Sequence, residues 1–223
     1  MLYIVATPIG NLEDMTARAV RILKEVDLIA AEDTRTSGVL LKRYEITTPQ
    51  TSFHSYSDDR KVEELVAMML AGKKIALISD AGTPGISDPG FLLVRAARKA
   101  GITISPIPGP SAFLAALSAS GLPINHFLYL GFLPMKKGRQ TMLKKLQGEE
   151  NTIVFYESPH RILKTLKEMS EYFPERHVVV AREITKIFEE FASGSAAELY
   201  EHFNKKSPKG EFVVIMAGKD FRE

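Results

Sequence analysis

Cysteine and tryptophan are both absent from this 223-residue chain. Without cysteine there can be no disulfide, zinc–thiolate site or thiol nucleophile, and the absence fits a reducing compartment, so we expect a cytoplasmic protein. No apolar run reaches the roughly 18 residues of a membrane span. The opening segment, MLYIVATPIG, lacks the basic residues that begin a signal peptide. The sequence therefore predicts a soluble protein with no membrane partner.

An excess of charge of either sign is also missing, because 29 lysines and arginines nearly balance 27 aspartates and glutamates, for a net charge of +2. This balance excludes a surface that is basic throughout, so any RNA contact must come from local clusters. The chain has no G-x-G-x-x-G after its first apolar run and no triphosphate-binding G-x-x-x-x-G-K-[ST]. Ser111 lies outside a G-x-S-x-G nucleophile motif. The five histidines lack paired spacing, so no metal site is predicted.

Short apolar runs alternate with stretches in which apolar residues recur every three to four positions, which is typical of strands and helices in turn. The expected strands span residues 2–6, 28–31, 50–53, 75–79 and 102–107 in the first half and 127–131, 152–156, 177–181, 188–192 and 212–217 in the second. The expected helices span residues 59–71, 90–100, 111–120 and 160–172. The alternation predicts an α/β fold, and in the first half it predicts a largely parallel sheet covered on both faces.

A break in this pattern separates two halves of the chain. Glycine and proline interrupt the periodicity in GLPIN, residues 121–125. The chain is long enough, at 45% hydrophobic residues, for two compact domains. We therefore expect an N-terminal α/β domain over residues 1–120 and a C-terminal α/β domain over residues 121–223.

Four segments rich in glycine, proline and charge follow apolar runs and precede helices in the first half. They are ATPIGNLEDMT (6–16), AAEDTRTSG (30–38), SDAGTPGISDPG (79–90) and PIPGPSA (106–112). Ligands of open α/β sheets bind at the carboxyl ends of the strands, where such segments would lie. Glycine lets a ligand approach the backbone, proline fixes the loop shape, and the next helix offers unpaired N–H groups. The alternative is that these segments only make tight turns.

Seven segments, in order, resemble the rRNA-modifying members of the tetrapyrrole methylase family. They are TPIGNL (7–12), AEDTR (31–35), SDAGTPGISDPG (79–90), PIPGPSA (106–112), FYESPHR (155–161), AREITK (181–186) and GEFVV (210–214). The resemblance implies a two-domain tetrapyrrole methylase-like fold (class III methyltransferase), with S-adenosylmethionine (SAM) in the interdomain cleft and a homodimer. It also implies in-line methyl transfer to the ribose 2′-hydroxyl of a cytidine in the decoding region of 16S rRNA, within the small ribosomal subunit.

The same resemblance assigns cofactor contacts to bare segments of backbone. The residues so assigned are Pro8, Asp80, Ala81, Gly82, Thr83, Ser111, Ala112, Tyr156 and Glu157. Pro8 would close the floor of the site, and the three residues after Asp80 would expose main chain to the cofactor. A turn-forming cap is the alternative for Asp80. Asp88 is expected to start the helix over residues 90–100.

Charged residues in the same segments are candidates for activating the ribose hydroxyl. They are Glu32, Asp33, Arg35, Arg182, Glu183 and Lys186. An interdomain salt-bridge network is an equal alternative for this group. The sequence does not name the general base.

Phosphate contacts call for lysine and arginine, and MKKGRQTMLKK (135–145) holds five basic residues and no acidic one. Its central glycine suggests a mobile loop. The RNA-binding candidates are Lys136, Lys137, Arg139, His160 and Arg161. A solvated face is the alternative for this run, and Phe132 either stacks on a base or packs in the core.

The family often carries a basic helical extension after its last strand, whereas the sequence printed here stops at Glu223. We therefore expect ribosome docking to depend on residues 135–145 and on a dimer surface. Two other functions stay open. A small-molecule methyltransferase acting on a tetrapyrrole or corrin would share the fold, and a non-catalytic ribosome-assembly factor would bind RNA without turnover.

Overall fold

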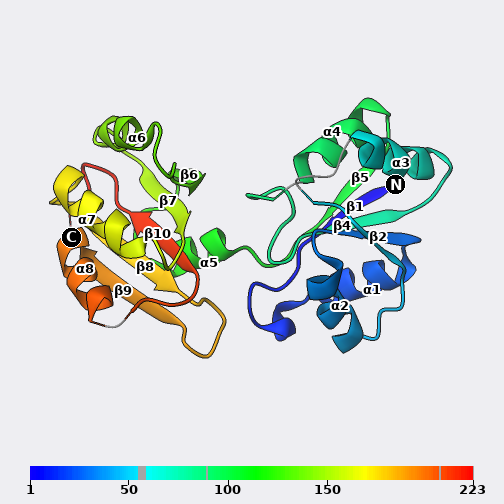
Figure 1. The fold of residues 1–223 in the computed structure, drawn as a ribbon, viewed down its shortest axis with the longest axis horizontal. Coiled ribbons are helices and arrows are strands. Elements are labelled where there is room, and N and C mark those ends of the chain that lie inside the picture. Colours follow the sequence, from blue (N-terminus) through cyan, green and yellow to red (C-terminus); the bar gives the residue numbers. More distant parts are fainter. Residues whose placement is uncertain (55–58, 89, 206, 223) are drawn as a thin grey trace. The chain divides into compact units, whose positions relative to one another are not determined.

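The computed structural model describes residues 1–54, 59–88, 90–205 and 207–222. The chain divides into two compact units, Met1–Ser111 and Ala112–Glu223, called unit 1 and unit 2 below. Each unit contains one five-stranded sheet with its helices (Figure 1). Helix α5 (Ala112–Ala119) belongs to unit 2, where its Phe113 ring lies 4.6 Å from the ring of Tyr129. A boundary after residue 120 stays a prediction.

The sheet of unit 1 is parallel throughout, in the strand order β3-β2-β4-β1-β5. Its strands are β1 (Leu2–Val5), β2 (Leu28–Ala31), β3 (Gln50–Ser52), β4 (Ile75–Ile78) and β5 (Ile104–Ile107). Its helices are η1 (Leu12–Asp14), α1 (Ala17–Glu25), α2 (Thr34–Arg43), α3 (Asp59–Leu70) and α4 (Gly90–Lys99). The predicted parallel sheet is confirmed for this unit.

Both faces of this sheet are covered, because successive side chains of a strand point to opposite faces. Ile29 and Ile78 belong to a core cluster with α1 and α2, whereas Ile75 and Leu77 belong to a second cluster with α3 and α4. Figure 1 shows the two helix pairs on opposite sides of the sheet. The layering leaves the carboxyl ends of all five strands at one edge.

Helices α1 and α2 correspond to the helices that the sequence predicts, without giving their bounds, for the first two of the four loop segments. Each begins at a capping residue: the Thr16 hydroxyl accepts a hydrogen bond from the Ala19 N–H (3.1 Å), and the Asp33 carboxylate accepts one from the Arg35 N–H (2.8 Å). The caps satisfy N–H groups that a helix start leaves unpaired. Capping residues therefore mark these two starts more clearly in the sequence than the apolar pattern does.

The sheet of unit 2 is mixed, in the strand order β6-β7-β10-β8-β9. Its strands are β6 (Phe127–Phe132), β7 (Thr152–Glu157), β8 (His177–Arg182), β9 (Glu190–Ser195) and β10 (Phe212–Met216). Besides α5, its helices are α6 (Arg139–Leu146), α7 (Ile162–Tyr172) and α8 (Ala196–Asn204). Only the β6–β7 pairing is parallel, and the other three are antiparallel. Unit 2 differs from unit 1 in this respect, because β8 and β9 form a hairpin and β10 inserts between β7 and β8.

Two local expectations for unit 2 are also corrected. The basic run over residues 135–145 is not a loop throughout, since α6 begins at Arg139 and buries Leu143 and Leu146 in the unit 2 core. The strand expected over residues 188–192 begins at Glu190 instead. Among the described residues, no helix is long and apolar enough to cross a membrane.

Candidate functional site

Three loops of unit 1 meet where the strands end. Thr7, after β1, exchanges backbone hydrogen bonds with Gly82, after β4: the Thr7 N–H donates to the Gly82 carbonyl (2.9 Å) and the Gly82 N–H donates to the Thr7 carbonyl (3.0 Å). The Thr83 hydroxyl donates to the carbonyl of Pro110, after β5 (3.1 Å). The loops after β1, β4 and β5 are therefore tied to one another directly.

The loop after β2 joins this group through carboxylates. The Asp33 N–H donates to the Asp80 carboxylate (3.0 Å), and the Asp80 N–H donates to the Glu32 carboxylate (3.4 Å). Asp80 thus accepts a hydrogen bond from another loop, as well as standing at the end of its own strand. The predicted gathering of all four loops at one sheet edge is confirmed, and we call this group the loop edge.

Two glycines make tight turns at the loop edge. Gly82 has a φ of +83°, which favours glycine, and a Cβ there would lie 3.5 Å from Ile9 Cγ2. At Gly109 a Cβ would lie only 2.9 Å from the Cβ of Ala6. Pro8 and Gly82 are buried, whereas Asp80 and Ala81 are exposed. The turns therefore bring backbone segments close together and leave Asp80 and Ala81 open to a ligand.

The charged residues after β2 are paired with one another. Arg35 Nη2 lies 2.7 Å from an Asp33 carboxylate oxygen, and the Arg35 side chain is otherwise 90% exposed. Hydrogen bonds from the Arg35 side chain and N–H lower the pKa of Asp33 to about 2. Asp33 is therefore a weak proton acceptor near neutral pH.

Asp88 has an unusual electrostatic environment that sequence reasoning missed. Burial, together with the negative charges of Glu32 and Asp80, raises the pKa of Asp88 to about 6, although a hydrogen bond with the Ser79 side chain opposes the shift. A carboxyl group with such a pKa exchanges protons near neutral pH. The signal available in the sequence was three carboxylates placed at the ends of strands that the sheet makes adjacent.

The candidates from the β8–β9 connection form an ion cluster within unit 2. Lys186 Nζ lies 2.9 Å from a Glu183 oxygen and 2.9 Å from a Glu211 oxygen. The Glu211 N–H also donates to Glu183 (3.0 Å). Partial burial by itself would raise the pKa of Glu183, but the hydrogen bonds from Lys186 and Glu211 outweigh it, so the pKa lies below its usual value. Gly210 makes room for this carboxylate, since a Cβ there would lie 2.5 Å from Glu183 Cδ.

Arg182 is held apart from this cluster. Its Nε donates to the Lys209 carbonyl (2.7 Å) and its Nη1 lies 3.4 Å from a Glu190 oxygen. The salt-bridge alternative therefore describes Arg182, Glu183 and Lys186 within unit 2, where every partner belongs to the same sheet or its loops.

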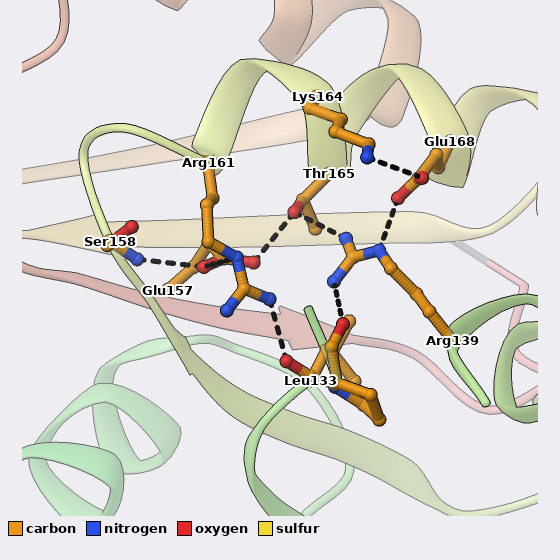
Figure 2. Close-up of polar contacts among 9 residues, drawn as sticks. Leu133, Arg139, Glu157, Ser158, Arg161, Lys164, Thr165 and Glu168 are labelled. Atoms are coloured by element: carbon orange, nitrogen blue, oxygen red, sulfur yellow. Dashed lines mark hydrogen bonds and ion pairs between the residues drawn. The ribbon is translucent and has the colours of Figure 1, made fainter. Parts of the chain in front are cut away.

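The carboxylate of Glu157 is fully buried in a polar network (Figure 2). One oxygen accepts from the Ser158 N–H (2.9 Å) and lies 3.1 Å from Arg161 Nε, and the other accepts from the Thr165 hydroxyl (2.7 Å). Its side chain is thus committed to internal partners, so a cofactor contact by Glu157 is left to its main chain. The neighbouring Tyr156 is half-buried and offers its ring.

Arg139 is a core residue, and its predicted role in phosphate binding is wrong. The residue is 4% exposed, and its guanidinium donates to the Glu168 carboxylate (2.7 Å), the Thr165 hydroxyl (2.7 Å) and the Pro134 carbonyl (3.1 Å). Figure 2 shows these bonds on one side of α7. Three of the five N–H groups of this guanidinium have these internal partners, and its side chain is only 5% exposed, so it does not face solvent phosphates. Arg161 is partly committed in the same way, since its Nη2 donates to the Leu133 carbonyl (2.7 Å).

The remaining RNA candidates, Lys136, Lys137 and His160, are all exposed. They lie in the loops after β6 and β7, whose parallel pairing brings both carboxyl ends to one edge of unit 2. Among the residues described, no group of three or more histidine, aspartate and glutamate side chains is arranged to hold a metal ion.

Comparison with known proteins shows which proteins this chain is similar to in sequence and fold. The chain is 51% identical over 220 residues to the Ribosomal RNA small subunit methyltransferase I of Synechocystis, covering 98% of this chain and 79% of that protein. It is 48% identical over 219 residues to the protein of the same name from Thermotoga maritima, covering 98% and 99%. A solved uroporphyrin-III C-methyltransferase from Thermus thermophilus, complexed with S-adenosylhomocysteine, shares the fold at a TM-score of 0.64 and 19% identity, covering 97% of this chain and 96% of that one.

A family model agrees with these relatives and covers most of both units. The model described as Tetrapyrrole (Corrin/Porphyrin) Methylases matches residues 1–200. The match includes the loop edge of unit 1 and the Glu157 network of unit 2. With the fold, the gathered loops and the relatives in agreement, this chain belongs to the tetrapyrrole (corrin/porphyrin) methylase family.

Proposed function

We propose that this chain is an rRNA methyltransferase that uses SAM to methylate the ribose 2′-hydroxyl of a cytidine in the decoding region of 16S rRNA. The names of its relatives support a substrate in small-subunit rRNA. The S-adenosylhomocysteine complex of a protein with the same fold supports SAM as the donor. The observation that carries the proposal is the loop edge, where four loops from neighbouring strands are tied together by hydrogen bonds.

The loop edge suits the cofactor because a ligand can reach main-chain groups there. The exposed residues Asp80 and Ala81 and the half-buried Thr83 would hold polar parts of SAM, beside the buried Pro8 and Gly82, whose N–H and carbonyl are paired with Thr7. Ser111 follows the loop after β5. In unit 2, the proposal assigns cofactor contacts to Ala112, to the Tyr156 ring and to the main chain of Glu157.

Bound SAM supplies a methyl group already activated by its sulfonium. In the proposed transfer the ribose O–C bond forms as the S–CH₃ bond breaks, S-adenosylhomocysteine leaves, and the hydroxyl proton passes to a base. Alignment contributes up to roughly 7–11 kcal/mol to such a step, and a positioned base adds about 10² to 10⁴-fold.

In this proposal the charged groups have two roles, which are to accept the hydroxyl proton and to stabilise negative charge on the ribose oxygen. Among the predicted catalytic carboxylates, the proposal assigns Glu32 as the proton acceptor, because Asp33 has a pKa of about 2 and hydrogen bonds lower the pKa of Glu183. Asp88, with its pKa raised to about 6, is a second candidate at the same edge. Arg35 and Lys186 would stabilise negative charge on the ribose oxygen. For Lys186, burial alone would lower the pKa, but its bonds to Glu211 and Glu183 raise it, so this cation stays charged.

Methyl transfer is tested with small ribosomal subunits that lack the modification. The protein is incubated with these subunits and [methyl-³H]SAM, and the label is mapped to an alkali-resistant linkage, the mark of a 2′-O-methylated ribose. We expect label at one cytidine. Label that appears only in an added porphyrinoid would instead identify a small-molecule methyltransferase. Binding to subunits without label would identify an assembly factor.

The proposal includes a cytoplasmic homodimer acting on the assembled small subunit. The relatives are named as ribosomal RNA methyltransferases, and such a function fits the compartment in which ribosomes are assembled. Light scattering coupled to size-exclusion chromatography measures the mass directly. A mass near twice the 24.8 kDa of one chain is expected, and a mass of one chain at micromolar concentration would remove the dimer from the proposal.

A further inference from the structure

The edge strand β6 carries a bulge that decides which face its last residue occupies. Its pairing with β7 shifts by one residue between Tyr129 and Phe132, so that Phe132 lies opposite Tyr156. Gly131, inside the shift, has a φ of +62° and permits the turn. With regular pairing, Phe132 would lie opposite Glu157 and share the core face. The bulge instead places Phe132 on the face that carries Tyr129 and Tyr156.

The result is a row of aromatic rings on one face of unit 2. The ring centroids of Phe132 and Tyr156 are 5.6 Å apart, those of Tyr156 and Tyr129 are 5.7 Å apart, and those of Tyr129 and Phe113 are 4.6 Å apart. Phe132 stands at the end of the row and is 53% exposed. We call the exposed ring of Phe132, which the Tyr156 ring supports from one side, the aromatic surface. A ring supported by neighbours on one side and open on the other can stack on a nucleobase.

The chain directly after Phe132 is fixed from below. Arg161 Nη2 donates to the Leu133 carbonyl (2.7 Å), and Arg139 Nη1 donates to the Pro134 carbonyl (3.1 Å). Leu133 itself is 3% exposed. The buried network of Figure 2 therefore holds the exit of β6 in place. A ring held in this way loses little conformational freedom when a ligand stacks on it.

Exposed cations lie in the loops at the same edge of unit 2. Lys136 and Lys137 follow Phe132 after three residues and are exposed, as is His160 in the loop after the parallel neighbour β7. An aromatic ring flanked by solvent-facing cations matches a single nucleic acid strand, with its bases toward the ring and its phosphates toward the cations.

We propose that the aromatic surface stacks on an unpaired nucleobase of an RNA strand whose phosphates contact Lys136 and Lys137. The inference rests on the proposed function and deepens it, because it requires the substrate segment to be single-stranded at this surface. A base within a duplex is covered on both faces by its neighbours, so it cannot stack on Phe132.

Stacking is measured with a 12-nucleotide single-stranded RNA that carries the fluorescent cytosine analogue pyrrolocytosine in its centre. Binding to the wild-type protein should quench the analogue, because stacking on an aromatic ring quenches it. In Phe132→Leu we expect the quench to disappear and the dissociation constant to rise about fivefold to a hundredfold. Phe132→Trp should keep the quench, and a duplex of the same sequence should show none.

The matched control is Phe91→Leu in α4, which removes a phenylalanine that is 62% exposed in unit 1. It should leave RNA affinity and quench unchanged. Calorimetry with SAM alone should give the same affinity for Phe132→Leu and wild type, and light scattering should give the same mass. An unchanged quench in Phe132→Leu overturns the proposal. If Phe132→Leu also loses affinity for SAM, the Phe132 ring contacts the cofactor, and the proposal is overturned. If the variant changes the mass measured by light scattering, the ring lies between two copies of the chain, and the proposal is overturned as well.

Failure of the proposed function gives a different pattern. If the protein transfers no methyl group to small subunits but Phe132→Leu still abolishes the quench, the aromatic surface is an RNA-binding site of a protein with another activity. If label appears in rRNA but the quench is the same in both proteins, only the inference about Phe132 fails.

Discussion

The sheet edges of the two units offer a ligand different kinds of contact. The loop edge of unit 1 is built from glycine, proline and short carboxylates, and its loops are joined by backbone hydrogen bonds such as those between Thr7 and Gly82. The corresponding edge of unit 2 rests on long buried side chains, with Arg139 and Arg161 holding loop carbonyls. The edge of unit 1 offers backbone groups, whereas the edge of unit 2 offers aromatic and cationic side chains. The comparison predicts that mutations damage the two edges in different ways.

The largest expected effect is on the stability of unit 2. Arg139→Ala removes the buried partner of Glu168 and Thr165, which leaves a carboxylate and a hydroxyl without their donors. Loss of one partner of a buried pair costs about 3–5 kcal/mol of unfolding free energy. Urea denaturation measures the loss, with Lys137→Ala as the exposed control that should change stability by less than about 0.5 kcal/mol. Equal stability of the two variants would contradict the core role of Arg139.

The next effect should separate ligand binding from stability in unit 1. Gly82 and Gly72 have similar positive φ values, +83° and +91°, so leucine at either position introduces a similar backbone strain of about 1–2 kcal/mol. Only Gly82 lies at the loop edge, and a Cβ at Gly72 meets nothing within 4 Å. Calorimetry should show SAM affinity reduced at least about tenfold, or about 1.4 kcal/mol, in Gly82→Leu and unchanged in Gly72→Leu. Equal SAM affinities would remove the cofactor from this edge.

A smaller effect is expected from the exposed lysines of unit 2. Lys136→Gln with Lys137→Gln should weaken RNA binding a few-fold at physiological salt, because each lysine that meets a phosphate releases counterions. The slope of log affinity against log salt should become shallower by about 1.4 for a single strand. Titration at several salt concentrations gives the slope. A slope equal to that of the wild type would leave this run as an ordinary solvated face.

The smallest effect concerns the pH dependence of stability and contrasts two carboxylates of unit 1. The raised pKa of Asp88, about 6, means that the folded state holds its proton more tightly than the unfolded state, so the stability it contributes is present below about pH 4 and is lost as pH rises through 6. Asp88→Asn should therefore stabilise the protein at pH 7, on the order of 1 kcal/mol after allowance for partial exposure. Urea denaturation at pH 4 and pH 7 measures the difference.

Asp33 should behave in the opposite sense in the same experiment. Its pKa is lowered to about 2, so its contribution is present above pH 4 and is lost as pH falls through 2. Asp33→Asn should thus destabilise the protein at pH 7. If Asp88→Asn and Asp33→Asn shift stability in the same direction at pH 7, the electrostatic description of the loop edge is wrong.

Features carried by the backbone were predictable from the sequence. The spacing of apolar residues and the positions of glycines locate β1, β4 and the turns around Gly82. Buried strands require apolar residues, and a positive φ favours glycine, so both features are visible in the sequence. The antiparallel insertion of β10 leaves no such mark, since pairing order depends on contacts between distant segments. The helix that starts at Arg139 was predicted as a loop for a similar reason, because its packing also depends on contacts with distant segments.

Roles carried by side chains were less predictable. A basic run looks alike whether its arginine faces water or a buried glutamate, and only the positions of Glu168 and Thr165 decide the case for Arg139. The raised pKa of Asp88 depends on its burial, on Asp80 in the same loop and on the neighbouring strand β2, which brings Glu32 close to it. Burial and charge at a site are properties of several chain segments together, so a single segment cannot reveal them.

Assigned amide spectra, recorded with and without S-adenosylhomocysteine, test the loop edge most directly. The account predicts the largest shifts at the N–H groups of Ala81 and Thr83. Shifts confined to unit 2, for example at the hollow lined by Arg176 and His177, would contradict it.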